Sequence, residues 1–183
     1  MSWIISLWLA LQSTPAEAEA LRSTAPAYLT PWSAGQHLGA ARIAAAGYDV
    51  DASVILAIAY HESRFFVSTR TQEPPDSGGA RVSCGVMTPV PKRYCDDQDL
   101  TLLGGYQAGA AHLRQWMDVC HAMDRWKHDV HDVEILRCAM WAYAGGSGFR
   151  RRCAVRGNLP GCGAVRQFEE RTRVIRQVLG VAR

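Results

Sequence analysis

Glu62 is the residue whose type and position in this sequence most clearly suggest chemistry. Residues 54–64 are helix-forming and largely apolar, and Ile55, Ile58 and Glu62 fall at positions i, i+3 and i+7. These positions share a helical face, which predicts a carboxyl group on the side that packs into the protein. Burial and the negative end of the helix dipole both raise the pKa of such a carboxyl group, which makes it a proton donor near neutral pH. The alternative is that Glu62 reaches solvent or pairs with Arg64.

Histidine spacing gives little support for a metal site. His61 and Glu62 begin like the zinc motif H-E-x-x-H, but Phe65 stands where the second histidine is required. His128 and His131 are also close in sequence, yet no third ligand is evident near them, which favours surface histidines. We therefore expect no metal ion and no other cofactor.

Four blocks of the sequence occur in an order that resembles one known superfamily. They are AYHESRF at 59–65, CGVMTPVP at 84–91, LGGYQAGAAHL at 103–113 and AYAGG at 142–146. The first resembles the Glu-Ser motif of the lytic transglycosylase and goose-type lysozyme superfamily. The second, third and fourth are similar to its Gly-Leu-Met-Gln block, the following helix and its Tyr-Asn-Ala-Gly block. Residues 173–179 resemble its closing helix, so the likeness covers about residues 35–180.

The resemblance implies a lysozyme-like fold with a groove for glycan strands of bacterial peptidoglycan. The bond cut would be the β-1,4 link between N-acetylmuramic acid and N-acetylglucosamine, with Glu62 as the acid. In the transglycosylase branch the same residue then acts as base and the muramoyl end closes into a 1,6-anhydro ring. This is the reaction that we expect. The residues implied in substrate binding are Ser63, Gly85, Val86, Met87, Thr88 and Tyr143.

Two departures from the superfamily pattern keep other functions open. Thr88 stands where the family usually has Gln, and Ala144 stands where it has Asn. Both changes remove polar contacts to substrate. A non-catalytic member that binds glycan, or a structural part of a secretion, pilus or phage assembly, therefore remains an alternative.

A second carboxylate would instead favour hydrolysis, because many glycosidases use one to position water. Glu73 and Asp76 lie in the loop before the Gly-Val-Met block, and the goose-type branch carries an aspartate in that general region. A lysozyme that uses Glu62 with Asp76 or Glu73 is thus the enzymatic alternative. The other interpretation is that both are ordinary loop charges.

The cysteines predict an oxidising location. The count is even, no C-x-x-C pair occurs, and pairing of sequence neighbours would join Cys84 to Cys95, Cys120 to Cys138 and Cys153 to Cys162. Six free thiols in a cytosolic protein are the alternative. A short apolar run at residues 3–11, followed by alanines, is typical of a cleavable leader, although no Lys or Arg precedes it. We expect a periplasmic or secreted protein, or one associated with a virion.

The charge distribution is uneven. Residues 150–183 hold nine arginines against Glu169 and Glu170, a formal charge of +7, whereas the whole chain carries +3. This pattern is typical of a solvated helix face or of a surface that favours a polyanion. The aromatic interleaving of a nucleic-acid module is missing, so we expect no nucleic-acid partner. We expect a monomer.

The elements that must position these residues are mostly helices. Their patterns predict one mainly α domain at residues 33–183, preceded by a leader or N-terminal helix at 1–20 and a linker at 21–32. A long loop or small hairpin is expected around 71–99, where glycines and prolines gather. Tryptophans at 116, 126 and 141 stack on sugars or, more often, belong to the core. Helices are expected at 33–46, capped by Ser33 and ended by Gly47, at 52–64, capped by Asp51, at 101–123, at 133–143 and at 164–179, ended by Gly180.

Overall fold

In a computed structural model, the chain is described at residues 8, 13–25, 28–67, 70–72, 82–87, 97–98, 100–124, 135–144 and 163–180. Within these ranges the protein is mainly α-helical, as predicted. The helices are α2 (Pro15–Ser23), α3 (Pro31–Tyr48), α4 (Ala52–Ser63), α5 (Leu102–Asp124), the helix of residues 135–144 and α7 (Gly163–Leu179). Two short strands, β1 (Arg70–Gln72) and β2 (Val82–Cys84), complete the described elements.

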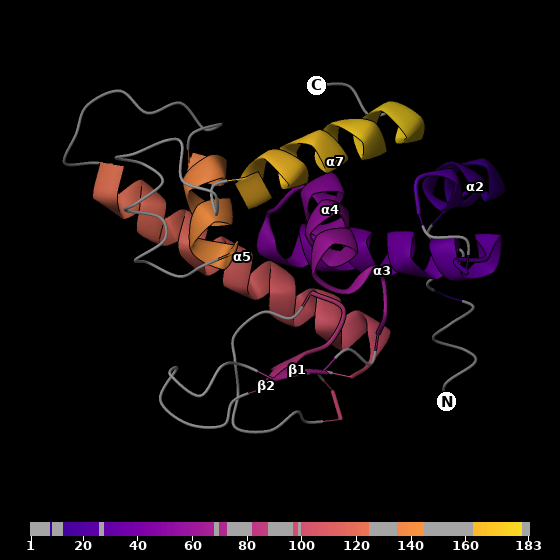
Figure 1. The fold of residues 1–183 in the computed structure, drawn as a ribbon, viewed down its shortest axis with the longest axis horizontal. Helices are drawn as coiled ribbons and strands as arrows, with labels where there is room; N and C mark the ends of the chain where they lie inside the picture. Colours follow the sequence, from indigo (N-terminus) through magenta and orange to yellow (C-terminus); the bar gives the residue numbers. More distant parts are fainter. Residues whose placement is uncertain are drawn as a thin grey trace.

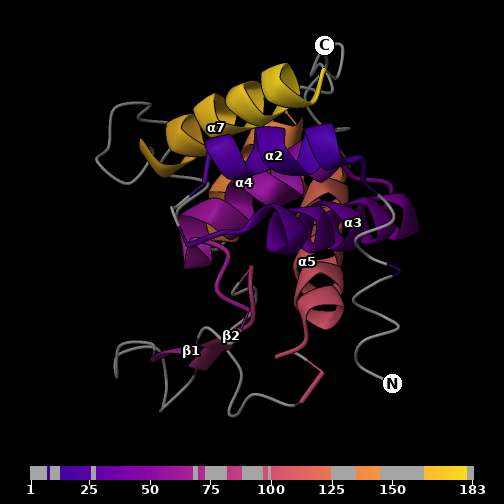
Figure 2. The same ribbon diagram turned by 90° about the vertical axis from the view of Figure 1, so that its right-hand side faces the viewer.

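Helix α4 occupies the centre of the molecule. It packs against α3, α5 and α7, and α2 lies against α3 and α7 (Figures 1 and 2). Its residues from 54 to 59 are buried on every side, which explains why this run is apolar around the whole helix. The element that carries Glu62 is therefore held by three neighbouring helices.

The beginning of α4 was predicted correctly. Asp51 caps it, and the Asp51 carboxylate accepts a hydrogen bond from the backbone N–H of Ser53 at 2.7 Å. A carboxylate at this position satisfies a donor that the first helical turn leaves unpaired. The helix then runs to Ser63, and Arg64 ends it in a left-handed conformation.

The predicted cap of α3 was wrong. Thr30, rather than Ser33, caps the helix, and the two residues form a reciprocal capping box. Pro31 fits the first helical turn because its missing N–H has no helical partner to lose. The helix also continues through Gly47 to Tyr48, where Asp49 turns left-handed at φ 51°.

Helix α2 lies where the sequence suggested a leader followed by a linker. It spans the expected boundary at residue 20, and residues 21–23 are helical. Leu21 is fully buried, and Glu17 forms an ion pair with Arg42 of α3 at 2.5 Å. This helix is thus a packed part of the described fold, while the cleavable leader stays a prediction.

The remaining element boundaries lie within about two residues of those expected. Gly180 ends α7 with φ 65°, as predicted for a glycine C-cap. Strands β1 and β2 pair antiparallel, with Thr71 opposite Ser83, in the region where a small hairpin was expected. The pair lies below the helices near the N-terminal part of α5 (Figure 2).

One predicted disulfide is confirmed. Cys120 of α5 is bonded to Cys138 of the helix of residues 135–144. Cys84 is also disulfide-bonded, but Cys95, Cys153 and Cys162 lie outside the described residues, so the other two pairings stay predictions. None of the helices in the described ranges has the length and apolar character that crossing a membrane requires.

Candidate functional site

Glu62 lies in the last turn of α4 and is half-buried. The chain turns sharply after it, because Arg64 and Phe65 both have positive φ, at 55° and 69°. Left-handed backbone is unfavourable for bulky residues and persists where the surroundings hold it in place. Two such residues occur in succession directly after Ser63, one residue beyond Glu62, so the surrounding packing must hold this helix end in place.

Aromatic packing holds this turn. The ring of Phe65 is buried, 5.0 Å from the His37 ring and 5.8 Å from the Tyr60 ring. Outside it, Tyr28 donates a hydrogen bond to the carbonyl of Arg64 and its ring stacks on Phe66 at 4.6 Å. The rings of His37 and Tyr60 hold Phe65, and Tyr28 holds Arg64 and Phe66 at the surface. The last turn of α4 therefore has little freedom to unwind.

Ser63 connects α4 to the segment of residues 82–87. Its buried hydroxyl lies 2.6 Å from the carbonyl oxygen of Val86 and 3.0 Å from that of Ala59. A hydroxyl carries a single hydrogen, and the shorter distance favours donation to Val86. The serine beside Glu62 therefore binds the backbone of the Gly-Val-Met block.

The Gly-Val-Met block is packed rather than open to solvent. Gly85 has φ 82°, which glycine adopts without steric cost, and Val86 and Met87 are fully buried. Met87 packs directly against Gly109 of α5. A Cβ at this glycine would lie 2.3 Å from the Met87 sulfur. Val86 and Met87 thus contribute backbone oxygens to the site and side chains to the core.

Tyr143 connects the same block to the helix of residues 135–144. Its hydroxyl donates a hydrogen bond to the carbonyl of Met87 at 2.8 Å. Burial, and secondly the charge of Glu62, raise the pKa of Tyr143 well above its usual value. The phenol therefore stays neutral, and it lies close enough to Glu62 for the charge of that carboxylate to affect its pKa.

His112 is a member of this cluster that the sequence interpretation did not select. Its ring lies 5.2 Å from the Tyr143 ring, and its Nε2 accepts a hydrogen bond from the indole N–H of Trp116 at 3.0 Å. Burial lowers the pKa of His112, so the neutral ring carries its proton on Nδ1. A histidine and a tryptophan four residues apart on one helix face were the available signal.

The structure thus brings together Glu62, Ser63, residues 85–87 and Tyr143 from three distant parts of the chain. Arg64 does not pair with Glu62, because its guanidinium lies over the Tyr60 ring at 4.5 Å. Trp116 and Trp141 pack against the core, as expected for most tryptophans at such spacing. The predicted site residues Thr88, Glu73 and Asp76 lie outside the described residues, as do Trp126, His128 and His131.

The described part of the chain contains no group of three or more His, Cys, Asp or Glu side chains arranged to hold a metal ion. The cluster offers a half-buried carboxyl group near a neutral phenol. Comparison with known proteins finds no matching family model, no matching curated protein and no matching solved structure.

Proposed function

We propose that this protein cleaves the glycan strands of bacterial peptidoglycan, with Glu62 as the catalytic acid. The observation that carries the proposal is the convergence of the sequence blocks on one another. Ser63 binds the Val86 carbonyl at 2.6 Å, and Tyr143 binds the Met87 carbonyl at 2.8 Å. Blocks that resemble a single superfamily in sequence thus also share one hydrogen-bonded cluster around the glutamate.

The proposed reaction is that of a lytic transglycosylase. Glu62 donates its proton to the glycosidic oxygen as the bond from C1 of N-acetylmuramic acid breaks. The resulting carboxylate then takes the proton of the 6-hydroxyl of the same sugar, whose oxygen bonds to C1. The products are a free 4-hydroxyl on N-acetylglucosamine and a 1,6-anhydro end, and no water is consumed.

Tyr143 has a positioning role in this proposal. Because burial and the nearby carboxylate both disfavour its ionised form, the phenol keeps its hydrogen and remains a donor to Met87. Loss of a proton from Glu62 would then place a negative charge next to a neutral group rather than next to another anion. This arrangement supports a carboxyl group that changes its protonation state during the reaction.

The proposal includes a lysozyme-like fold and an oxidising location. Support for the fold is the central buried α4 with the glutamate at its C-terminal end, surrounded by α3, α5 and α7. Support for the location is the Cys120–Cys138 bond, since such bonds persist in the periplasm, outside the cell or on a virion surface.

The test is digestion of purified sacculi followed by mass spectrometry of the fragments. We expect the wild-type protein to release anhydro-muropeptides and Glu62→Gln to lose at least about 100-fold of this activity while still binding sacculi. Glu19→Gln removes an exposed carboxylate on α2 and serves as the matched control, with activity unchanged.

The fragments also decide between the alternatives. Reducing ends would identify a hydrolase and refute the transglycosylase reaction. Intact sacculi that retain the bound protein would refute catalysis altogether, and a Glu62→Gln protein that cuts normally would refute the role of Glu62.

A further inference from the structure

A cleft lies on the other side of α4. It has a volume of about 670 Å³ and is lined by residues of this helix and of α7. Its lining residues on α4 are Ala57, Tyr60, His61 and Arg64, which follow the i, i+3, i+4, i+7 pattern of one helix face. At about 100° per residue this face is roughly opposite Glu62, so the cleft is separate from the proposed catalytic cluster.

The cleft has an excess of positive charge. Arg64, Arg166 and Arg171 line it together with Glu170, so three positive charges less one negative leave a formal charge of +2. Burial and the nearby Arg64 lower the pKa of His61, which is therefore neutral at pH 7. Glu170 is held by Arg173, outside the cleft, at 2.6 Å.

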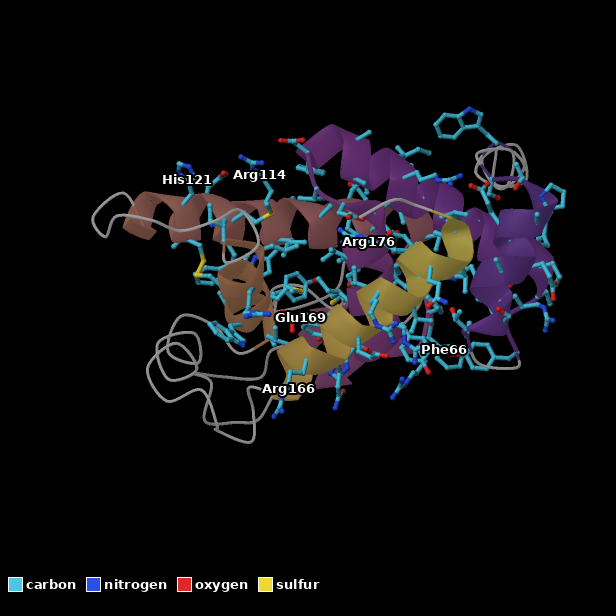
Figure 3. All side chains as sticks on the ribbon, turned by 90° about the horizontal axis from the view of Figure 1, so that it is seen from above. Phe66, Arg114, His121, Arg166, Glu169 and Arg176 are labelled. Carbon is cyan, nitrogen blue, oxygen red and sulfur yellow. A yellow bond between two sulfur atoms is a disulfide. The ribbon has the colours of Figure 1, made fainter. Side chains whose placement is uncertain are left out.

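The other arginines of α7 are already paired, which distinguishes them from those in the cleft. Arg173 binds Glu170, and Arg176 binds Asp51 at the start of α4. Among the described residues, Arg64, Arg166 and Arg171 form no ion pair with a carboxylate. Figure 3 shows Arg166 projecting from the first part of α7, well separated from Arg114 on α5.

Two of the three guanidinium groups are positioned in advance. Arg171 lies 3.8 Å and Arg64 4.5 Å from the centre of the Tyr60 ring. Arg171 also donates a hydrogen bond to the Thr24 carbonyl at 2.7 Å, beyond the end of α2. A guanidinium that packs on an aromatic ring still has N–H groups at its edge for an anion, and it loses little entropy on binding.

We propose that this cleft binds a phosphate monoester. Guanidinium groups recognise phosphate through paired N–H donors, and a monoester carries about −1.5 to −2 charges at pH 7, which matches the +2 lining. A carboxylate or a phosphodiester, with a single negative charge, neutralises only half of it. The volume leaves space for the organic group that the phosphate esterifies.

The experiment is calorimetric titration of the full chain with glycerol 1-phosphate, with acetate as the carboxylate comparison. We expect saturable binding of the phosphate ester and much weaker binding of acetate. Arg166→Ala should weaken the affinity about tenfold, as should Arg64→Asn, which suits the left-handed backbone at this position. Glu170→Gln should tighten binding, because it removes the negative charge of the lining.

Arg114→Ala is the matched control. It deletes the same charge from an exposed position on α5 and should leave the affinity unchanged. The proposal is overturned if no saturable binding occurs at millimolar ester, or if Arg114→Ala weakens binding as much as Arg166→Ala. Thermal melting of each variant identifies any loss that comes from unfolding.

A second experiment, vesicle binding, distinguishes a phosphate monoester on a lipid from one on a free small molecule. Phosphatidylcholine vesicles with and without phosphatidic acid present the same monoester on a lipid surface. Binding that requires phosphatidic acid and is displaced by glycerol 1-phosphate supports a lipid ligand in this cleft, and binding of the soluble ester alone supports a free one. Glycan cleavage by Arg166→Ala should stay at the wild-type level, so this proposal and the catalytic proposal fail independently.

Discussion

The two sides of the last turn of α4 differ in the polar groups that they present. One side has neutral hydroxyl groups, and the other has arginine side chains. On the Glu62 side, the neutral hydroxyl groups of Ser63 and Tyr143 donate hydrogen bonds to backbone carbonyls. On the other side, cations lie over the ring of Tyr60, and the cleft stays open. The same helical turn thus has hydroxyl donors on one side and an arginine-lined cleft on the other.

The largest expected effects are those of two variants, one on each side of α4, that each change either glycan cleavage or phosphate affinity but not both. Glu62→Gln should remove at least about 100-fold of the glycan cleavage and leave the affinity for glycerol 1-phosphate unchanged. Arg166→Ala should weaken the affinity for glycerol 1-phosphate about tenfold and leave glycan cleavage unchanged. Sacculus digestion and calorimetry on the same two preparations measure both properties, and a variant that lost both would mean that the two sides are not independent.

Acid should destabilise the fold beneath both sides of the α4 turn, because the His37 ring packs against Phe65 at the end of this turn. Its Nδ1 is 2.9 Å from the Tyr106 hydroxyl, and burial lowers its pKa from 6.5 to about 4. The unfolded chain therefore binds a proton here at a higher pH than the folded chain, so stability is lost as pH falls from 6.5 to 4. At about 1.4 kcal/mol per pKa unit, the loss approaches 3 kcal/mol.

Denaturant unfolding at pH 7 and pH 4 measures this loss. His37→Asn keeps a hydrogen-bonding group near Tyr106 but does not titrate, so its stability should change less over the same interval. His61 and His112 also have pKa values lowered by burial and contribute equally to both proteins. Equal pH dependence of the wild type and the variant would contradict the assignment to His37.

Gly109→Ala should affect only the Glu62 side. The added Cβ would lie 2.3 Å from the sulfur of Met87 and displace the Gly-Val-Met block from α5. We expect a loss of about 2 kcal/mol in the free energy of unfolding, typical of an overpacked core, together with slower glycan cleavage. Gly47→Ala is the control, because nothing lies within 4 Å of a Cβ there. Phosphate affinity should not change in either variant.

Tyr143→Phe should have the smallest effect, about 1 kcal/mol, since it removes one hydrogen bond to the Met87 carbonyl. Its diagnostic readout is the pH profile of glycan cleavage. If Tyr143 positions the site next to Glu62, the alkaline limb of that profile, where Glu62 loses the proton that it must donate, should move in the variant. A protein that is merely less stable would keep the profile and lose amplitude.

The sequence predicted the helices well because their patterns are local. Asp51 and Gly180 marked two ends correctly, whereas Ser33 was chosen as a cap although Thr30 forms the reciprocal bonds with it. The difference arises because Thr30, followed by a proline, competes with a serine three positions later, and both are favourable caps. Local propensity alone does not rank them.

The candidate site was predicted in part. The position of Glu62 came from periodicity and a resemblance, and Ser63 and Tyr143 came from the resemblance. His112 and the cleft beside α7 were missed, because they depend on which helix faces meet across the chain. The uneven arginine distribution indicated a cationic surface, but only tertiary structure separates Arg166 from the paired Arg173 and Arg176.

The bond between Cys120 and Cys138 has a consequence for the oxidation state in which this protein works. It joins the C-terminal half of α5 to the helix of residues 135–144, which carries Tyr143, as the yellow bond in Figure 3 shows. Under a reductant that link opens, and the helix of residues 135–144 then keeps its place through side-chain packing, the Arg137–Glu169 ion pair and the hydrogen bond from Tyr143 to Met87. The redox potential of the surroundings therefore sets how firmly the tyrosine is kept beside the glutamate.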